Sequence, residues 1–245
     1  MMNIIINGAC GQMGKEVAKI IEASEDKRIA AKVDKFAAES GCYNDIDDFS
    51  GSADMIIDFS NHLGTEQLLE YAVKRNIPVV LATTGHTDDE LKLIDRASEK
   101  IPVFHSANMS LGVALLVELA VKTAAVMPDA DIEIVETHHN RKLDAPSGTA
   151  LMIANAIRSV REKAQFKLGR AGNAKREKDE IGIHAVRRGN IVGIHEVHVS
   201  TDNQTITLKH EAHSRALFAE GAVSAAEFIK NKPAGLYTMN SIVTE

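Results

Sequence analysis

The sequence predicts an α/β fold in which a doubly wound parallel sheet is followed by a second, α+β domain with a mixed sheet. Over residues 1–107, short apolar runs alternate with amphipathic helical segments, the pattern of βα units in a parallel sheet. A glycine-rich turn follows the first of these runs. After residue 108 the pattern changes to a long apolar helix, and three consecutive strand-like segments come later in the chain.

Composition limits the classes of function. The 245 residues are 44% hydrophobic and 25% charged, which is typical of a globular protein with a substantial core. The formal net charge is −6 and the basic residues are dispersed, which disfavours a nucleic-acid partner. We see no apolar run of the roughly 18–20 residues that cross a bilayer, and no signal-peptide pattern. We therefore expect no membrane partner. Cys10 and Cys42 form no Cys-x-x-Cys pair, which indicates a reducing compartment, so we expect a cytoplasmic protein.

The first βα unit carries a candidate phosphate cradle. A strand is predicted over residues 2–7, and an amphipathic helix starts near Met13. The turn between them holds Gly8, Gly11 and Gly14, which let the backbone turn tightly and place a pyrophosphate at the helix N-terminus. The G-x-x-G-x-x-G spacing is weak evidence by itself. Its place between a strand and a helix predicts a Rossmann-type dinucleotide-binding domain.

The second strand ends at the residue expected to select the cofactor. This strand, residues 29–33, is followed by Asp34, where an acidic side chain would bind the adenosine ribose hydroxyls. A carboxylate there favours NADH because it repels the 2′-phosphate of NADPH. Lys35 could pair with that phosphate instead, although a single lysine is more often a solvated surface charge. We therefore expect NADH or NADPH as cofactor.

Three further strands continue the predicted parallel sheet, at residues 55–59, 78–82 and 103–105, with helices at 65–75 and 88–100. Ligands on such sheets bind beyond the carboxyl ends of the strands, so we expect the residues there to line the nicotinamide side. Taken singly, each of these ends is ordinary turn chemistry. The predicted cofactor-binding residues are Gly8, Ala9, Cys10, Gly11, Gln12, Met13, Asp34, Lys35, Ala82, Thr83, Thr84, Ser106, Ala107, Asn108 and Met109.

The second half of the chain is predicted to be α+β. A buried helix is expected over residues 111–127 and another helix over 149–163. Residues 163–180 are highly charged and are expected to form a polar loop. The remaining predicted elements are strands at 181–187, 193–200 and 205–210, a tight turn at 202–204 and a final helix at 216–230.

Residues 136–150 hold the most informative stretch of the chain. It follows a strand and contains His138, His139 and Lys142 within five residues. If the strand alternates to its end, the two imidazoles diverge and only one can point at a reacting atom. A hydrogen-bonded histidine pair closing a strand would be the structural alternative. The nearby lysine favours a proton-transfer site.

The same stretch ends in a helix start that suits an anion. Ser147 is the expected N-cap, and the backbone N–H groups of Gly148 and Thr149 would be unpaired in the first turn. The helix dipole adds partial positive charge there. An anionic substrate would fit this place, with an imidazole close enough to transfer a proton and Lys142 to balance developing negative charge.

The other histidines do not predict a metal site. His195 and His198 would lie on opposite faces of a strand, and the chain has no His-Glu-x-x-His pattern. No cysteine lies nearby to complete a zinc set. We expect these histidines on polar or interface surfaces: His184, His195, His198, His210 and His213.

Residues 136–150 resemble the central motif of the 4-hydroxy-tetrahydrodipicolinate reductase (dihydrodipicolinate reductase) family, which acts in the diaminopimelate route to lysine. The similarity spans the whole chain. Supporting motifs lie at residues 8–14, 83–85, 107–112 and 187–193.

The resemblance implies a two-domain, NAD(P)H-dependent oxidoreductase. Residues 1–107 would bind the dinucleotide, residues 108–216 would bind substrate and form the oligomer, and residues 217–245 would pack back on the first domain. Hinges between the domains would close on binding. The small dicarboxylate substrate would be reduced to tetrahydrodipicolinate by hydride from the nicotinamide, and the protein would be a homotetramer.

The resemblance also implies roles for single residues. His138 would be the proton donor, and Lys142 would supply a proton or stabilise the intermediate. His139, Gly148 and Thr149 would bind the substrate, the last two through a carboxylate. Two features depart from the family. Gln12 stands where the family commonly has arginine, and the segment 35–54 is short.

Two alternatives remain open. The chain could be another two-domain NAD(P)-dependent oxidoreductase, of the amino-acid dehydrogenase kind, acting on a different small anion. It could also be a non-catalytic dinucleotide sensor. A sensor would need neither the histidine pair nor Lys142 beside a helix N-terminus, so the sequence disfavours it.

Overall fold

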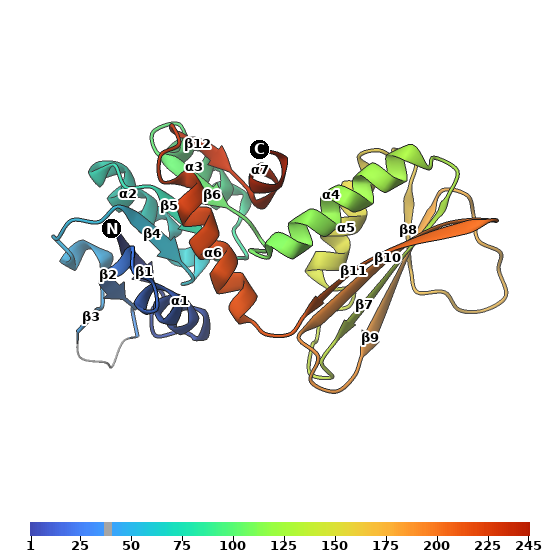
Figure 1. Cartoon of the computed structure of the whole chain (residues 1–245), viewed down its shortest axis with the longest axis horizontal. Coiled ribbons are helices and arrows are strands. Elements are labelled where there is room, and N and C mark those ends of the chain that lie inside the picture. Colours follow the sequence, from blue (N-terminus) through green and yellow to red (C-terminus); the bar gives the residue numbers. More distant parts are fainter. Residues whose placement is uncertain (37–40) are drawn as a thin grey trace. The chain divides into compact units, whose positions relative to one another are not determined.

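A computed structural model of the chain describes residues 1–36 and 41–245. Residues 37–40, part of the segment expected to be short, lie outside the described residues. The chain forms two compact units, one made of Met1–Leu111 with Arg215–Glu245 and the other of Gly112–Ser214 (Figure 1).

The first unit is an α/β domain built on a parallel sheet. In the part of the chain that the structure describes, its strands are β1 (Met2–Asn7), β2 (Lys27–Val33), β3 (Cys42–Tyr43), β4 (Met55–Asp58), β5 (Val79–Leu81), β6 (Pro102–His105) and β12 (Gly235–Tyr237). Their order is β12-β6-β5-β4-β1-β2-β3, and all neighbours are parallel. The chain winds outward in both directions from β1, so a crevice is expected at the carboxyl ends of β1 and β4.

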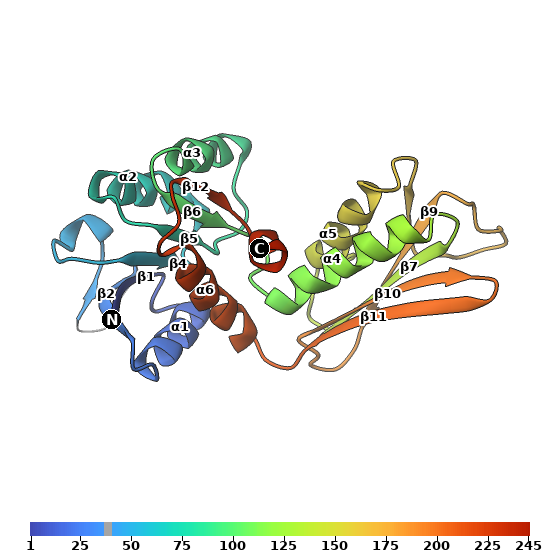
Figure 2. The same cartoon turned by 45° about the horizontal axis from the view of Figure 1, so that its top comes forward.

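Helices cover both faces of this sheet (Figures 1 and 2). They are α1 (Gln12–Glu22), α2 (Thr65–Arg75), α3 (Asp88–Ser98), α6 (Ala216–Ile229) and α7 (Met239–Thr244). On one face α1 packs beside α6, and on the other α2 packs beside α3. This doubly wound arrangement confirms the predicted fold class.

Burial on both faces explains the composition of the central strands. Ile4, Ile5 and Ile6 in β1 are consecutive and fully buried. In a parallel sheet covered by helices, a strand has no solvent face, so it carries a continuous apolar run instead of an alternating one. β4 shows the same pattern from Met55 to Ile57.

The C-terminal segment completes the first unit. Lys27 and Glu227 form an ion pair of 2.6 Å between β2 and α6. After α6, β12 pairs in parallel with β6 at the edge of the sheet. Neither β12 nor α7 was predicted, because three- and six-residue elements carry too little periodicity to be recognised.

The second unit, in which every residue from 112 to 214 is described, is a two-layer α+β domain. Its strands are β7 (Asp131–His138), β8 (Gln165–Leu168), β9 (Glu180–Arg187), β10 (Gly193–Thr201) and β11 (Gln204–Ala212). The order β11-β10-β7-β9-β8 combines antiparallel pairs at β7-β10-β11 with parallel pairs at β7-β9-β8. The predicted mixed sheet is confirmed.

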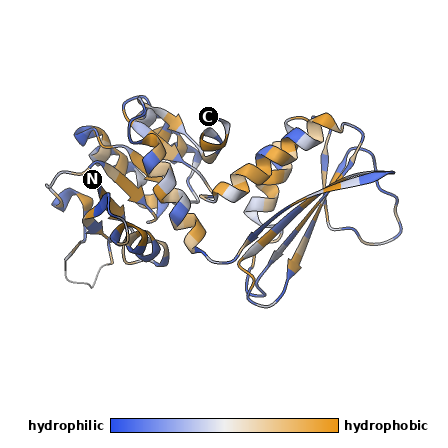
Figure 3. Cartoon of the chain, in the orientation of Figure 1, coloured by the Kyte–Doolittle hydropathy of each residue, from blue (hydrophilic) through white to orange (hydrophobic). Residues whose placement is uncertain are grey.

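Two helices, α4 (Leu111–Val126) and α5 (Gly148–Arg158), cover one face of the mixed sheet. The expectation that the first of them is buried was wrong for one of its sides. Leu115 and Leu119 are 48% and 42% exposed, although α4 is hydrophobic along most of its length (Figure 3). A helix that packs on a sheet through one stripe leaves its other stripe uncovered within the unit.

A polar loop was expected over the whole charged segment 163–180, but part of this segment forms a strand. Residues Gln165–Leu168 form β8, which pairs in parallel with β9 at the edge of the sheet. Local composition indicated a loop, and pairing with a partner strand overrides such a preference at a sheet edge.

Candidate active site

The glycine turn of the first unit has the geometry of a phosphate cradle. Gly8 has φ of +79°, and a Cβ atom there would lie 2.6 Å from the carbonyl oxygen of Phe59. A Cβ on Gly14 would collide with the carbonyl oxygen of Gly8. Gly11 is the N-cap of α1 and makes no side-chain cap hydrogen bond, so the helix N-terminus is left for an anion. Ala9 is buried beneath this turn.

Asp34 holds the end of β2 against the glycine turn. Its Oδ2 accepts the backbone N–H of Cys10 at 3.0 Å, and its Oδ1 accepts the backbone N–H of Phe36 at 3.0 Å. Lys35 between them is exposed. The carboxylate therefore lies at the edge of the cradle, where the sequence placed the adenosine ribose.

Sequence reasoning missed Arg215 at this cradle. Its Nη1 donates a hydrogen bond of 2.9 Å to Oε1 of Gln12, which lies 203 residues earlier in the chain. A guanidinium thus stands at the first turn of α1, although position 12 itself lacks the family's arginine. Met13, the next residue of that turn, is half-buried. No local pattern could have revealed a contact over this separation.

The end of β5 divides into a buried and an exposed part. Ala82 and Thr83 are buried, and the hydroxyl of Thr83 donates to Oδ2 of Asp58 at 2.6 Å. Its side chain is therefore turned into the domain. Thr84 is exposed.

The end of β6 is a hydrogen-bonded turn. The hydroxyl of Ser106 donates to the backbone carbonyl of Asn108 at 2.7 Å, and the side-chain oxygen of Asn108 accepts the backbone N–H of Ser110 at 2.8 Å. Ala107 is exposed at its tip, whereas Met109 is buried. The turn is thus held in one conformation by its own polar groups.

In the second unit, His138 is the last residue of β7 and its ring is nearly buried, with the whole residue 8% exposed. Its Nδ1 lies 2.6 Å from Oε2 of Glu136. His139 leaves the strand, and its backbone N–H donates to the carbonyl of Ile191 at 2.8 Å. The two histidines differ in environment, since His138 alone is in contact with the carboxylate two residues before it.

Glu136 is fully buried and is surrounded by donors. Arg187 on β9 donates to both of its oxygens at 2.8 Å, and the backbone N–H of Ser147 donates to Oε1 at 2.9 Å. Burial alone would raise the pKa of this carboxyl group. The hydrogen bonds from His138, Arg187 and Ser147 outweigh burial and lower the pKa to about 2.

The N-terminus of α5 follows directly. Ser147 is the N-cap, as predicted, and its hydroxyl accepts the backbone N–H of Ala150 at 3.2 Å. Gly148 is exposed and Thr149 is half-buried in the first turn. The predicted anion-binding residues therefore lie at an accessible helix N-terminus, next to the carboxylate that holds His138.

The expectation that His195 lies on a polar or interface surface was wrong. It is 4% exposed, its ring centroid is 5.2 Å from that of His138, and its Nε2 lies 3.1 Å from the hydroxyl oxygen of Ser147. Burial, followed by the neighbouring His138, lowers the pKa of His195 to about 4, so the ring is neutral near pH 7. In the antiparallel register of β7 and β10, His195 faces Glu136, and the sequence does not specify this register.

Lys142 lies in the loop between β7 and α5. Its Nζ is 2.8 Å from Oδ1 of Asp144, and its side chain is 21% exposed. The backbone carbonyl of Asp144 accepts a hydrogen bond of 2.7 Å from Nη2 of Arg187. The second unit thus brings together the predicted proton donor, lysine and helix N-terminus.

Family models match both parts of the chain. The N-terminal part of dihydrodipicolinate reductase matches residues 2–109, and the C-terminal part matches residues 112–243. The chain belongs to the dihydrodipicolinate reductase family. The family, the enzyme class and the reductase reaction of lysine biosynthesis that the sequence predicts are confirmed. Membership of this family also implies a pyridine nucleotide cofactor and a small dicarboxylate substrate.

Members of this family are similar to this chain over their full length. The 4-hydroxy-tetrahydrodipicolinate reductase of Caldanaerobacter subterraneus subsp. tengcongensis is 48% identical over 99% of this chain and 98% of its own. That of Rickettsia rickettsii is 41% identical over 99% of both chains. A dipicolinate-bound dihydrodipicolinate reductase from Paenisporosarcina sp. TG-14 has the same fold, with a TM-score of 0.82, 24% identity and 97% of each chain covered.

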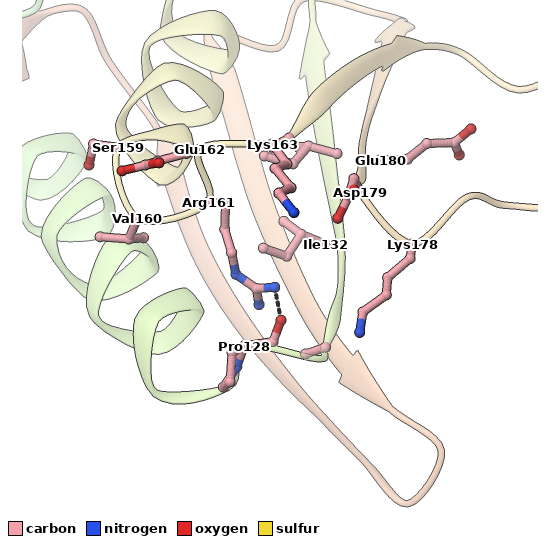
Figure 4. A pocket seen from close by; sticks show the side chains of 13 residues that line it. Pro128, Ile132, Ser159, Val160, Arg161, Glu162, Lys163, Lys178, Asp179 and Glu180 are labelled. Carbon is pink, nitrogen blue, oxygen red and sulfur yellow. Dashed lines mark hydrogen bonds between the residues drawn. The ribbon is translucent and has the colours of Figure 1, made fainter.

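The second unit also has a cavity of about 400 Å³ (Figure 4). It is lined by residues near the start of β7, such as Ile132, whereas His138 ends the same strand. Arg161 extends along it and donates to the backbone carbonyls of Met127 and Pro128 beyond α4. This arginine caps the end of a helix, so we assign the cavity no role in the reaction. Among the described residues, no helix is both long and apolar enough to cross a bilayer.

Proposed function

We propose that the second unit protonates and holds a small cyclic dicarboxylate, 4-hydroxy-tetrahydrodipicolinate or its dehydrated form, while it is reduced. One observation carries this proposal. A nearly buried imidazole, His138, stands beside the N-terminus of α5, with Lys142 in the loop that connects them. Proton transfer and anion binding are thereby available at one place.

Each residue has a task in this proposal. The backbone N–H groups of Gly148 and Thr149 bind one carboxylate of the substrate, and His139 contacts the ring. A dihydronicotinamide, when bound, supplies a hydride to the conjugated imine. His138 donates a proton to the substrate atom that gains negative charge, and Lys142 stabilises that charge. The 4-hydroxy form first loses water to give the conjugated C=C–C=N ring. One hydride and one proton are then added to this ring, which loses one of its two conjugated double bonds and keeps a C=N bond in the product.

The first unit suits the dinucleotide. At Gly8 a Cβ would fill the turn, and the N-terminus of α1 lacks a side-chain cap, so the backbone can approach a pyrophosphate there. Asp34 would bind the ribose hydroxyls and favours NADH. Arg215 beside Gln12 and the exposed Lys35 supply positive charge that tolerates NADPH. We infer that both cofactors are used.

The two units take different roles in the proposal. Residues 1–107 bind the dinucleotide with 217–245 packed against them, and residues 108–216 bind substrate and form the oligomer. We also propose a homotetramer, as the family resemblance implies; the sheet face opposite α4 and α5 carries polar side chains, such as Glu133 and His184, as well as Val186 at 38% exposure. We place the enzyme in the cytoplasm, as is usual for a biosynthetic enzyme of this family.

The test is substrate-dependent oxidation of the cofactor. Purified protein is mixed with NADH or NADPH, and the condensation product of pyruvate and aspartate semialdehyde is then added. We expect the nicotinamide absorbance to fall only after this addition, with either cofactor. No oxidation would refute the proposal, and oxidation of an amino acid with NAD⁺ instead would support an amino-acid dehydrogenase. Light scattering measures the proposed tetramer in the same sample.

A further inference from the structure

We propose that Glu136 is the positioning residue of this site, which fixes the orientation and tautomer of His138 so that the proton is delivered from Nε2. This inference rests on the proposed function, in which His138 is the proton donor. Glu136 does not touch substrate in the proposal. It acts through the imidazole and through the two neighbouring segments that it holds.

The carboxylate of Glu136 cannot rotate without losing hydrogen bonds at both oxygens. Oε2 contacts Nδ1 of His138 at 2.6 Å and accepts from Nη1 of Arg187 at 2.8 Å. Oε1 accepts from the backbone N–H of Ser147 at 2.9 Å and from Nη2 of Arg187 at 2.8 Å. Four contacts in two directions define the plane of the carboxylate, and the residue is fully buried.

This plane determines where the hydrogen of His138 lies. An ionised carboxylate only accepts hydrogen bonds, and the lowered pKa of Glu136 keeps it ionised at neutral pH. Nδ1 of His138 must therefore carry a hydrogen in both protonation states, and exchange with substrate takes place at Nε2. Gly193 leaves room on that side, since a Cβ there would lie 3.1 Å from Nε2.

The same carboxylate connects the other parts of the site. Through the N–H of Ser147 it fixes the start of α5, where the substrate carboxylate is proposed to bind. Through Arg187 it reaches the carbonyl of Asp144, whose side chain pairs with Lys142. One buried side chain thus fixes the positions of the proton donor, the anion site and the lysine loop relative to one another.

The chain contains a matched constellation on the same strand. Glu133, three residues earlier on β7, contacts Nε2 of His184 at 2.8 Å and Nε of Arg176 at 3.2 Å. Its side chain is 29% exposed, and it points to the opposite face of the sheet. Glutamine at this position removes the same kind of carboxylate without touching the proposed site.

The test compares Glu136→Gln with Glu133→Gln and the native enzyme. In Glu136→Gln an amide N–H faces Nδ1 of His138 or a guanidinium N–H of Arg187, so the imidazolium loses its partner. We expect kcat to fall about 100-fold, while the dissociation constant for NADH changes less than about twofold. We also expect the high-pH decline of kcat to move to lower pH by about one unit. Among the described residues, Glu136 and His195 contact His138, Arg187 donates to the same carboxylate, and Lys142 acts on the neighbouring His195.

The pH profile separates positioning from a purely structural role. A structural role would lower kcat by the same factor at every pH, and this result would overturn the proposal. For Glu133→Gln we expect kcat within about threefold of native and an unmoved decline. If Glu136→Gln does not fold, the ring nitrogens of His138 are observed by ¹⁵N NMR in the native enzyme, with His138→Gln for assignment. An Nδ1 without hydrogen would overturn the inference, whereas a native enzyme that oxidises no cofactor would refute only the proposed function.

Discussion

Asp58 in the first unit and Glu136 in the second are both fully buried carboxyl groups near the ends of strands, yet their surroundings are opposite. Among the described residues, the donors to Asp58 are neutral groups, of which the hydroxyls of Ser60 and Thr83 are the nearest, both at 2.6 Å. Burial raises the pKa of Asp58 in spite of these bonds. Glu136 has the guanidinium of Arg187 and the ring of His138, and its pKa is lowered.

The difference teaches that burial alone does not determine the charge of a carboxyl group. Neutral donors soften the loss of hydration at Asp58, whereas the hydrogen bond from His138 and the bidentate guanidinium of Arg187 outweigh it at Glu136. The first unit uses this carboxyl group at the end of β4 to hold Asn7 at the end of β1 and Thr83 just after β5. The second keeps a permanent negative charge beside an imidazole. This charge accepts the hydrogen of Nδ1 and so orients the ring of the proposed proton donor.

Removing Arg187, the cation that pairs with Glu136, should have the largest effect on stability. In Arg187→Met a carboxylate that is fully buried loses its guanidinium and must either stay charged or take up a proton. We expect the free energy of unfolding at neutral pH to fall by about 3 kcal/mol, measured by urea denaturation. The matched control is Arg176→Met, whose side chain is about as exposed as that of Arg187, at 18% against 19%.

The Arg176→Met control shows how much of the effect depends on burial of the carboxylate partner. Arg176 pairs with Asp131 and Glu133, whose side chains are 56% and 29% exposed and can be hydrated when it is removed. We expect a loss of about 1 kcal/mol. Equal losses in the two variants would show that the burial of Glu136 does not set the energy of its pair.

Acid should weaken the Glu136 pair next. A carboxyl group whose pKa is lowered in the folded state stabilises the protein above its unfolded pKa, and this contribution is lost as pH falls through the folded pKa. Native enzyme and Glu136→Gln are unfolded in urea at several pH values. Their difference in unfolding free energy should narrow by about 2 kcal/mol between about pH 6 and pH 3. A difference that does not vary with pH would contradict the lowered pKa.

Asp58→Asn should have the smallest effect. The remaining oxygen can keep the bonds from Asn7 and Ser60, and the new amide can donate to the hydroxyl oxygen of Thr83. We expect the unfolding free energy at neutral pH to change by less than about 1 kcal/mol, because no cation loses its partner. A loss of unfolding free energy as large as that of Arg187→Met would contradict the proposed difference between Asp58, which has neutral donors, and Glu136, which has a cationic partner.

Much of the fold could be predicted from periodicity. The helix at Thr65–Arg75 has the predicted bounds, and α1, α6 and most strands of both sheets lie where apolar patterns placed them. Short or edge elements were missed. β8 lies in a charged segment, and β12 has three residues, so both depend on pairing that local composition does not encode.

The candidate site could be predicted only for the residues that lie close together in the sequence. His138, Lys142 and Ser147 lie within ten residues of one another, and their order alone indicates a strand, a loop and a helix start. His195 and Arg187 reach the site across neighbouring strands of the mixed sheet. Their contribution depends on register, which a single sequence leaves open.

The most direct measurement concerns His138 itself. Turnover and NADH affinity are determined for native enzyme and His138→Gln, in which an amide replaces the imidazole. If this ring delivers the proton, kcat should fall at least about 100-fold while the dissociation constant for NADH stays within about twofold. A variant that turns over at nearly the native rate, or that loses NADH instead, would contradict the assignment of the proton donor.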